Sequence, residues 1–372
     1  MLKMDFFTTR QTERQETKMA THFERKQIMK LVKIILCGCG GVGKQFLQLI
    51  ADRSEEIREK YGLKLVVSAA VDVRGAAIAD SDAGLPLTDL LNFLNQGQEV
   101  QTFSTYGQAG ITGVEIISQI AADVMVETTP TNLVDGGVAK QHVFTALDQG
   151  LDVVSANKGP FVLFYEEVFK KAREKGCGLH ISAATAAALP TLDVGLTCLA
   201  GSRVSSAEGI LNGTTNYILS EMRNKGTDYD VALKEAQELG IAETNPSYDV
   251  EGKDTANKII LIANRVFGKT LGLADIQVQG ITKVTPVDIA EATNKGKVIK
   301  LIGTAEMIDG DIKLSVAPKL IDETHPLALV NGSEKAITYM TDTLGNITVS
   351  GGKSSPLGAA AAVLKDLINA CQ

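Results

Sequence analysis

A glycine pattern near the start of the chain constrains the fold most strongly. Residues Gly38-Cys39-Gly40-Gly41-Val42-Gly43 fit G-x-G-x-x-G and follow a short apolar run at 31–37. In this pattern the first glycine permits a tight turn, the second lets backbone N–H groups approach a pyrophosphate, and the third lets the next helix pack closely on the strand. A helix is predicted over 44–61. The strand–loop–helix context therefore favours dinucleotide binding over a simple packing turn, and it assigns to that site Gly38, Gly40, Gly41, Val42 and Gly43.

The segments after the glycines alternate between strand and helix. Residues 63–73 form a nearly unbroken apolar run, which is typical of a strand buried on both faces of a parallel sheet. Further strands are predicted at 123–127 and 152–155, with a helix between them. This alternation predicts an α/β fold whose N-terminal domain, residues 30–160, is a doubly wound Rossmann sheet.

The pattern loosens after Pro160. Helices are predicted near 164–175, 214–224, 230–239 and 253–267, and β-like runs occur near 278–283, 299–307 and 312–316. We therefore expect a C-terminal α+β domain over 161–345. The Gly-rich loop and apolar helix of 346–372 are expected to return to the first domain.

Composition excludes several classes of protein. Apolar residues make up 44% of the chain, so intrinsic disorder is excluded, and a net charge of −7 gives no electrostatic footprint for nucleic acid. No apolar run reaches the ~18 residues that a membrane span needs. Five scattered cysteines argue against a disulfide framework or a zinc site and favour a reducing cytoplasm. The polar residues 1–29 lack the apolar region of a secretory signal and are predicted to be a disordered leader.

Two residues at the end of the second strand bear on the choice of dinucleotide. The carboxylate of Asp72 suits the ribose hydroxyls of NAD, whereas the guanidinium of Arg74 suits the 2′-phosphate of NADP. The sequence therefore leaves NAD and NADP open.

Polar loops follow two later strands of the predicted sheet. Thr128-Thr129-Pro130-Thr131-Asn132 and Ala156-Asn157-Lys158-Gly159-Pro160 begin where those strands end. Ligands of open α/β sheets bind at this edge, so Thr128, Thr129, Asn157 and Lys158 are assigned to the cofactor site. The alternative for Lys158 is a solvated loop lysine.

A group of acids precedes the predicted helix 253–267. Asp254 and Lys258 are four residues apart and share one face of that helix. The run Ile259–Ile262 covers the whole circumference with apolar side chains, so the helix is expected to be buried and Lys258 to face an internal cleft, paired with Asp254. Such a pair suits proton transfer. The alternative is an exposed pair that contributes only ~0.3–0.5 kcal/mol.

A loop of small polar residues leads into the helix predicted at 214–224. Its residues Asn212, Gly213 and Thr214 offer backbone N–H and hydroxyl donors that suit a substrate carboxylate. The alternative is an ordinary helix cap.

Taken together, these motifs resemble homoserine dehydrogenase. The matching signature consists of Ala236, Gly240, Ile241, Ala242, Asn245-Pro246, Asp249-Val250, Gly252, Asp254 and Lys258, and the segments 128–132, 156–160 and 209–219 also resemble that family. The resemblance spans roughly residues 31–372. It implies reversible, NAD(P)H-dependent reduction of L-aspartate 4-semialdehyde to L-homoserine, in the aspartate pathway to threonine, methionine and isoleucine.

The resemblance also implies roles for individual residues. Lys158 and Lys258 match the family's catalytic lysines at the C4 oxygen, with the proton donor left open, and Asp254 would orient the substrate or Lys258. The amino-acid end of the substrate would be held by Glu243, Asp249, Thr214, Gly213 and Asn212, and Gly352 would join the cofactor site. The chemistry needs no metal, and a homodimer through the sheet of the second domain is expected.

Three departures from the family pattern are visible. Ser182 stands where many members carry Glu, which puts the family's monovalent-cation site near Thr185 and Ala187 in doubt. Ile241 stands where some members have Tyr. The chain resembles the short form without a C-terminal ACT domain, so feedback by threonine through such a domain is expected to be weak or absent.

Two other functions compete with this one. A different NAD(P)-dependent reductase of small amino-aldehydes or imines shares the domain plan, and a non-catalytic dinucleotide sensor would keep only the first domain. Lys158, Asp254 and Lys258 argue against the sensor, which needs no proton-transfer groups. Cys37 and Cys39, beside the glycine loop, are expected to be packing residues rather than redox switches.

Overall fold

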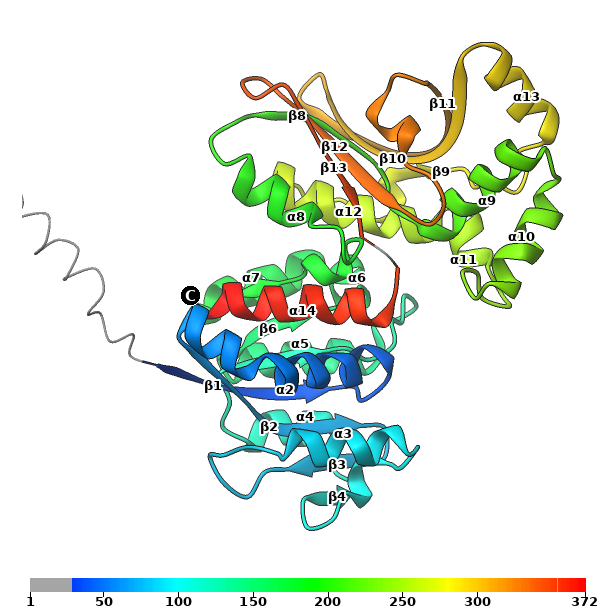
Figure 1. Ribbon diagram of the computed structural model, residues 1–372. Helices are drawn as coiled ribbons and strands as arrows, with labels where there is room; N and C mark the ends of the chain where they lie inside the picture. Colours follow the sequence, from blue (N-terminus) through cyan, green and yellow to red (C-terminus); the bar gives the residue numbers. More distant parts are fainter. Residues whose placement is uncertain (1–28, 353) are drawn as a thin grey trace, which may run out of the picture.

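The computed structural model describes residues 29–352 and 354–372, and they build two sheets with helices around each (Figure 1). The predicted leader, apart from Met29, lies outside the described residues. Within the described ranges no helix is long and apolar enough to cross a membrane.

The first sheet has seven strands in the order β4-β3-β2-β1-β5-β6-β7. The central pairs β1–β2, β1–β5, β5–β6 and β6–β7 are parallel, whereas β3 and β4 add an antiparallel edge. This confirms the doubly wound sheet. The strands are β1 (Lys30–Cys37), β2 (Leu63–Asp72), β3 (Gly75–Ile78), β4 (Gly107–Ala109), β5 (Val124–Glu127), β6 (Asp152–Ser155) and β7 (Leu179–His180).

Helices cover both faces of the first sheet. The C-terminal helix lies beside the first helix and shares its apolar core, so the end of the chain does return to the first domain (Figure 1). The helices of this domain are α2 (Gly41–Tyr61), α3 (Leu87–Asn95), α4 (Gly113–Gln119), α5 (Gly137–Asp148), α6 (Gly159–Leu163), α7 (Tyr165–Lys175) and α14 (Pro356–Cys371), with a 3₁₀ turn at η1 (Val100–Thr102).

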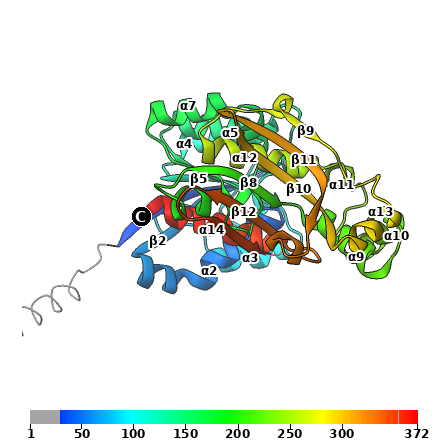
Figure 2. The ribbon, with the colours of Figure 1, turned by 90° about the horizontal axis from the view of Figure 1, so that it is seen from above.

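The second sheet has six strands in the order β13-β12-β8-β10-β11-β9, and Figure 2 shows it from above. Its pairs are antiparallel except β11–β9. The strands are β8 (Val204–Ile210), β9 (Ile276–Val278), β10 (Lys297–Ile308), β11 (Asp311–Asp322), β12 (Lys335–Thr341) and β13 (Asn346–Gly351). The helices are α8 (Thr191–Asp193), α9 (Gly213–Lys225), α10 (Tyr229–Glu238), α11 (Ser247–Val250), α12 (Lys253–Phe267) and α13 (Pro286–Asn294), with short turns η2 (Ser182–Ala184), η3 (Val194–Cys198), η4 (Leu273–Asp275) and η5 (Pro326–Leu329).

The domain boundaries expected from the sequence differ from the residue ranges of the two sheets. The first sheet takes its last strand from Leu179–His180, so residues after 160 still belong to it. At the other end, β13 pairs with β12, so only α14 returns to the first domain. The expected strand at 278–283 is wrong beyond Val278, because Gly280 packs so closely on the backbone of Val250 that a Cβ would lie 2.2 Å from its oxygen.

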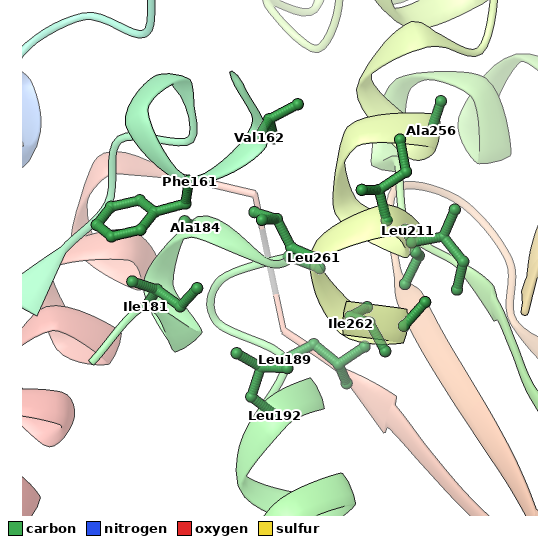
Figure 3. Close-up of a cluster of buried hydrophobic side chains, with 14 of the residues drawn as sticks. Phe161, Val162, Ile181, Ala184, Leu189, Leu192, Leu211, Ala256, Leu261 and Ile262 are labelled. Carbon is green, nitrogen blue, oxygen red and sulfur yellow. The ribbon is translucent and has the colours of Figure 1, made fainter. Parts of the chain in front are cut away.

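One apolar core runs through both domains. Figure 3 shows Phe161 and Val162 of α6 near Leu261 and Ile262 of α12, with residues of the segment 181–192 between the two helices. Each residue from Ile259 to Ala263 has no exposed surface. The burial predicted for this helix is therefore confirmed, and it places the polar residues of α12 at the boundary between the domains.

Candidate active site

The glycine loop joins β1 to α2, and it leaves no room for a side chain at Gly38 or Gly43. A Cβ on Gly43 would lie 1.9 Å from the carbonyl oxygen of Gly38, and a Cβ on Gly38 (φ +99°) would lie 2.8 Å from the backbone of Thr128. Gly40, in contrast, faces open space with nothing within 4 Å of a Cβ. Helix α2 begins at Gly41, three residues earlier than predicted, so its N-terminal N–H groups point into that space. This arrangement fits a pyrophosphate.

A cavity of about 650 Å³ opens in front of this loop. Its volume lies in the range of small-molecule sites. Of the residues assigned to the cofactor, it is lined by Gly38, Gly40, Gly41, Val42, Asp72, Thr128 and Thr129. The sequence analysis missed further lining residues, Thr112, Gly113, Val114, Gln141, His142 and Pro356. The first three lie at α4, which was not predicted, and the other three lie on helices that were predicted but not assigned to the site.

Asp72 and Arg74 lie in different surroundings. Asp72 lines the cavity at the end of β2, and its Oδ1 accepts a hydrogen bond from the backbone of Val73. The guanidinium of Arg74 instead pairs with Glu99, outside the set of lining residues. Of the two residues, only the carboxylate lines the cavity.

Asn157 and Thr128 brace the loops around the site. Thr128 Oγ1 lies 2.8 Å from the carbonyl oxygen of Gly38 and donates to it. Asn157 is buried, and its side-chain amide donates to the carbonyl oxygens of Thr129 and Pro130. The backbone N–H of Lys158 donates to Thr131 Oγ1 over 3.3 Å. These bonds fix the backbone of Lys158 at the edge of the first sheet.

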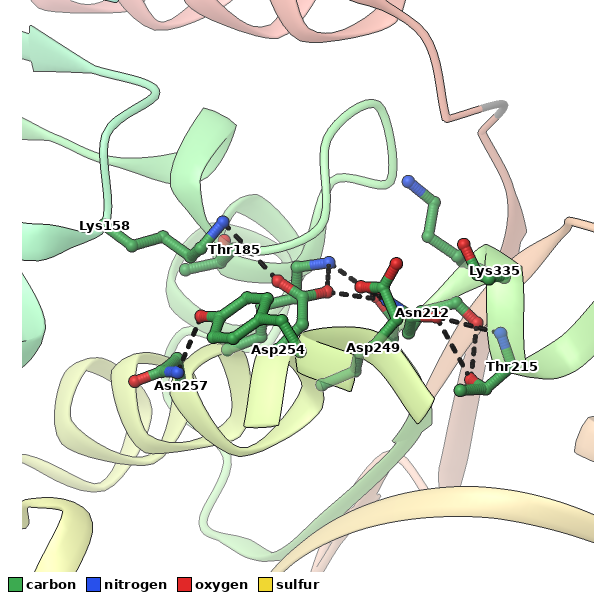
Figure 4. A network of polar contacts seen from close by, with 12 residues as sticks. Lys158, Thr185, Asn212, Thr215, Asp249, Asp254, Asn257 and Lys335 are labelled. Carbon is green, nitrogen blue, oxygen red and sulfur yellow. Dashed lines mark hydrogen bonds and ion pairs between the residues drawn. The ribbon is translucent and has the colours of Figure 1, made fainter. Parts of the chain in front are cut away.

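Two lysines from different domains meet at one carboxylate. Lys258 Nζ lies 2.5 Å from Asp254 Oδ2, and Lys158 Nζ lies 3.5 Å from Asp254 Oδ1 (Figure 4). Lys258 also donates to the carbonyl oxygen of Leu211 over 2.9 Å. The predicted pair of Asp254 and Lys258 in an internal site is therefore present, and the loop lysine is part of it rather than solvated.

The charge on Asp254 is set by these partners. Burial alone raises the pKa of the Asp254 carboxyl, but the attraction of Lys258 and Lys158 and the hydrogen bond from Asn212 outweigh it and hold the pKa well below its ordinary range. The carboxylate is therefore ionised at neutral pH, with two ammonium groups against it. Two ammonium groups that meet in a largely buried site suit an oxygen atom that gains negative charge during a reaction.

The polar loop before α9 joins the same network. The side-chain amide of Asn212 donates to Asp249 Oδ1 (2.7 Å) and to Asp254 Oδ2 (2.9 Å), while its oxygen caps α9 by accepting from Thr215. Asn212 is thus both a helix cap and a member of the site. Burial, followed by repulsion from Asp254, raises the pKa of Asp249.

Four other residues that the sequence analysis assigned to the substrate or the cofactor differ in their surroundings. Thr214 donates its hydroxyl to the carbonyl oxygen of Ile241, and Gly213 is buried so that a Cβ would lie 2.7 Å from the carbonyl oxygen of Ser333. Glu243 is exposed, and its carboxylate forms no ion pair within the described ranges. Gly352 packs on the backbone of Leu189, where a Cβ would lie 2.8 Å away, and it does not line the cavity. Gly213 and Thr214 thus follow Asn212 in the first turn of α9, whereas the side chain of Glu243 is exposed to solvent.

Sequence reasoning missed Lys335. It begins β12, is 2% exposed, and donates from its ammonium group to the carbonyl oxygen of Ala187. Burial and the nearby charge of Lys258 lower the pKa of Lys335 to about 7. Ser182, in the same segment as Ala187, donates its hydroxyl to Asp193 over 3.0 Å. The position of Lys335 at the start of an apolar strand is the sequence signal that could have identified it.

The cysteines beside the glycine loop are buried. Burial raises the pKa of the thiols of Cys37 and Cys39. A thiol that stays protonated is a poor nucleophile and reacts slowly with oxidants, so this environment supports the packing role. Cys37 also lies near Glu127 and His142, which form a buried pair with 2.8 Å between Oε2 and Nδ1.

Known proteins resemble this chain over nearly its whole described length. The family profile "Homoserine dehydrogenase, NAD binding domain" matches residues 38–182, and "Homoserine dehydrogenase" matches residues 190–368. The chain is 38% identical to a homoserine dehydrogenase of Methanocaldococcus jannaschii, over 90% of this chain and 97% of that protein. It is 33% identical to an NAD(+)-dependent homoserine dehydrogenase of Pseudomonas canavaninivorans, over 91% and 95%.

Solved structures agree with the sequence relatives. A putative homoserine dehydrogenase from Archaeoglobus fulgidus has a TM-score of 0.81 and 33% identity, covering 91% of this chain and 98% of that one. A hyperthermophilic archaeal homoserine dehydrogenase mutant in complex with NADPH has a TM-score of 0.78 and 25% identity, covering 92% and 98%. The resemblance first drawn from the motifs is confirmed. The chain belongs to the homoserine dehydrogenase family of NAD(P)-dependent oxidoreductases, which act on the CH–OH group of homoserine.

Proposed function

We propose that the two lysines and Asp254 form the reaction centre for the reversible reduction of L-aspartate 4-semialdehyde to L-homoserine. The observation that carries this proposal is the contact of Lys158, from the first domain, and Lys258, from the second, with the same buried carboxylate. A C4 oxygen placed beside Asp254 accepts hydrogen bonds from both ammonium groups. NAD or NADP, bound in the neighbouring cavity, supplies or takes the hydride.

The residues of the chain then have distinct tasks. The ammonium groups of Lys158 and Lys258 stabilise charge on the C4 oxygen, and one of them passes it the proton during reduction. Asp254 holds both lysines in place, since it lies within 3.5 Å of each. The cofactor would be held by the glycine loop, by the N-terminus of α2 and by the lining residues Asp72, Thr128 and Thr129. Asn157 fixes the loop of Thr129 by donating to its carbonyl oxygen.

The amino-acid end of the substrate is assigned to the α9 and α11 side of the site. Asp249 offers a carboxylate to the substrate ammonium group, and Asn212, Gly213 and Thr214 offer amide and hydroxyl groups nearby. Glu243, which is exposed in the loop after α10, is assigned to the same end of the substrate. Gly352 is assigned to the cofactor end of the site, although it packs on Leu189 and does not line the cavity.

We also infer a homodimer that forms through the second sheet, located in the cytoplasm. The use of cysteine supports the location, because the five cysteines are all free. Light scattering coupled to gel filtration tests the assembly: a mass of about twice the 39.5 kDa chain is expected, and a mass of one chain would contradict it.

The activity is tested by mixing the enzyme with L-homoserine and NAD or NADP at alkaline pH and following the absorbance of the reduced nicotinamide. Turnover that requires homoserine is expected. Turnover only with other amino-alcohols would favour the related reductase, and dinucleotide binding without turnover would favour the sensor. The Lys258→Ala variant is the control for the assigned centre.

A further inference from the structure

Lys335 is a buried charged residue outside the proposed chemistry. It is 2% exposed, and its hydrogen-bond acceptor is the carbonyl oxygen of Ala187. Taking an ammonium group out of water is unfavourable, and a single carbonyl oxygen offsets only part of that free energy. A lysine in this place is therefore unfavourable for stability alone.

The acceptor lies in the segment that carries the chain from the first domain to the second. Strand β7 ends at His180 in the first sheet, and α8 begins at Thr191 beside the second. Between them, the backbone N–H of Ala183 donates to Asp366 of α14 over 3.3 Å, so this part of the segment is bound to the first domain. Lys335 binds the later part, Ala187, to the second sheet.

The segment that returns from the second domain to the first also lies close to Lys335. In the register of β12 and β13, Lys335 is the partner of Gly351, the last residue of β13. Gly352, which comes next, packs on the backbone of Leu189. Lys335 thus lies where the outgoing and the returning chain contact each other.

The reaction centre is close to this point. Lys258, Asp254 and Lys158 are the charged groups whose fields act on Lys335, and Figure 4 shows Lys335 beside the network of Asn212 and Asp249. The 3.5 Å contact between Lys158 and Asp254 joins the two domains, so it depends on how the crossing segments hold one domain against the other.

We propose that Lys335 is a positioning residue: its Nζ group donates to the Ala187 carbonyl of the segment that leads from the first domain to the second, and thereby keeps Lys158 of the first domain against Asp254 of the second. The inference rests on the proposed roles of those two residues. It predicts that loss of this hydrogen-bond donor impairs the chemical step more than it impairs cofactor binding, because the glycine loop and nearly all other residues that line the cofactor cavity belong to the first domain before the crossing.

Lys335→Met tests this, because Met keeps much of the apolar stem and removes the charge. We expect kcat to fall tenfold or more, KM for the dinucleotide to stay within about twofold, and Tm to stay unchanged or to rise, because a buried charge is removed. The matched control is Lys300→Met. Lys300 is another buried lysine of the second domain, bonded to Asn216 and Val330 away from the crossing, and its variant is expected to keep wild-type kcat.

Two further measurements keep the proposal open to refutation. In Lys335→Ala, ethylammonium chloride is expected to restore part of kcat, whereas choline chloride at the same ionic strength is not. Hydrogen exchange of the amides of 183–189 is expected to accelerate at least tenfold in Lys335→Met and not in Lys300→Met, and this readout does not require turnover.

The outcomes separate this inference from the proposed function. A folded Lys335→Met enzyme with kcat within twofold of wild type, unchanged exchange at 183–189, or equal losses in both Met variants would overturn the role of Lys335. Absence of turnover in the wild-type enzyme would instead overturn the proposed reaction centre, and the exchange measurement would still decide whether Lys335 fixes the crossing segment.

Discussion

Replacing Asp254 by Asn removes the charge that holds the two lysines and keeps the shape of the side chain. Asp254 is 5% exposed and lies within 3.5 Å of both Lys158 Nζ and Lys258 Nζ. Breaking a buried ion pair on one side typically costs about 3–5 kcal/mol, because the remaining charge is left uncompensated. If the lysines lose their placement in the transition state, that free energy corresponds to a factor of about 10²–10⁴ in rate.

We therefore expect Asp254→Asn to lower kcat for homoserine oxidation at least 10²-fold. The assay is steady-state formation of reduced nicotinamide with homoserine varied at saturating dinucleotide. KM for the dinucleotide is expected to change little, because Asp254 does not line the cofactor cavity. Glu251→Gln is the matched control: it removes an acid three residues earlier whose partner is the exposed Lys253, and wild-type rates are expected.

The pH profile gives an independent check on the same residue. The lysines hold the pKa of Asp254 well below its ordinary range, so its stabilising contribution is present above the unfolded pKa of about 3.9 and is lost only in strong acid. No acidic limb from Asp254 is expected in the activity profile between pH 5 and 9. A folded Asp254→Asn enzyme with kcat within threefold of wild type would refute the reasoning.

Further predictions concern the proton donors, the glycine loop and a second buried lysine. Lys258→Ala is expected to lower kcat by a factor on the order of 10² or more, and wild-type turnover would remove Lys258 from the mechanism. Gly40→Ala is expected to keep Tm and weaken dinucleotide binding at least tenfold in calorimetry, whereas Gly43→Ala should lower Tm, because its Cβ would lie 1.9 Å from a backbone oxygen; equal effects of the two would contradict this account of the loop. Burial lowers the pKa of Lys300 to about 8, so the unfolded chain binds more protons above that pH. The free energy of unfolding should therefore gain a contribution between pH 8 and 10.5, on the order of 3 kcal/mol at most, that urea titrations find in the wild type and not in Lys300→Met.

The parts of the site that lie in local motifs were predictable from the sequence. The glycine loop has its own turn and helix signals, and the run after Lys258 indicated a helix buried on all sides, which the structure confirms. Spacing on one helix face also placed Asp254 beside Lys258. These features depend on residues within one helix or loop, so they can be predicted from the local sequence.

Features that depend on contacts between distant segments were not predictable. Lys335 begins a strand whose burial comes from β8, β13 and the crossing segment, none of which is a neighbour in local sequence. Glu243 shares the family spacing, yet spacing carries no information on whether a loop faces solvent. The strand expected through residue 283 ends at Val278, because Gly280 packs on the backbone near α11.

The central claim is that the carboxylate shared by Lys158 and Lys258 is where homoserine is oxidised. It is tested most directly by the initial rate of dinucleotide reduction with and without L-homoserine, for wild type and Asp254→Asn in parallel, at saturating NAD or NADP. We predict a homoserine-dependent rate in the wild type and at least a 10²-fold lower rate in the variant. The absence of a homoserine-dependent rate in the wild type with either dinucleotide, or equal rates in the two proteins, would contradict the account.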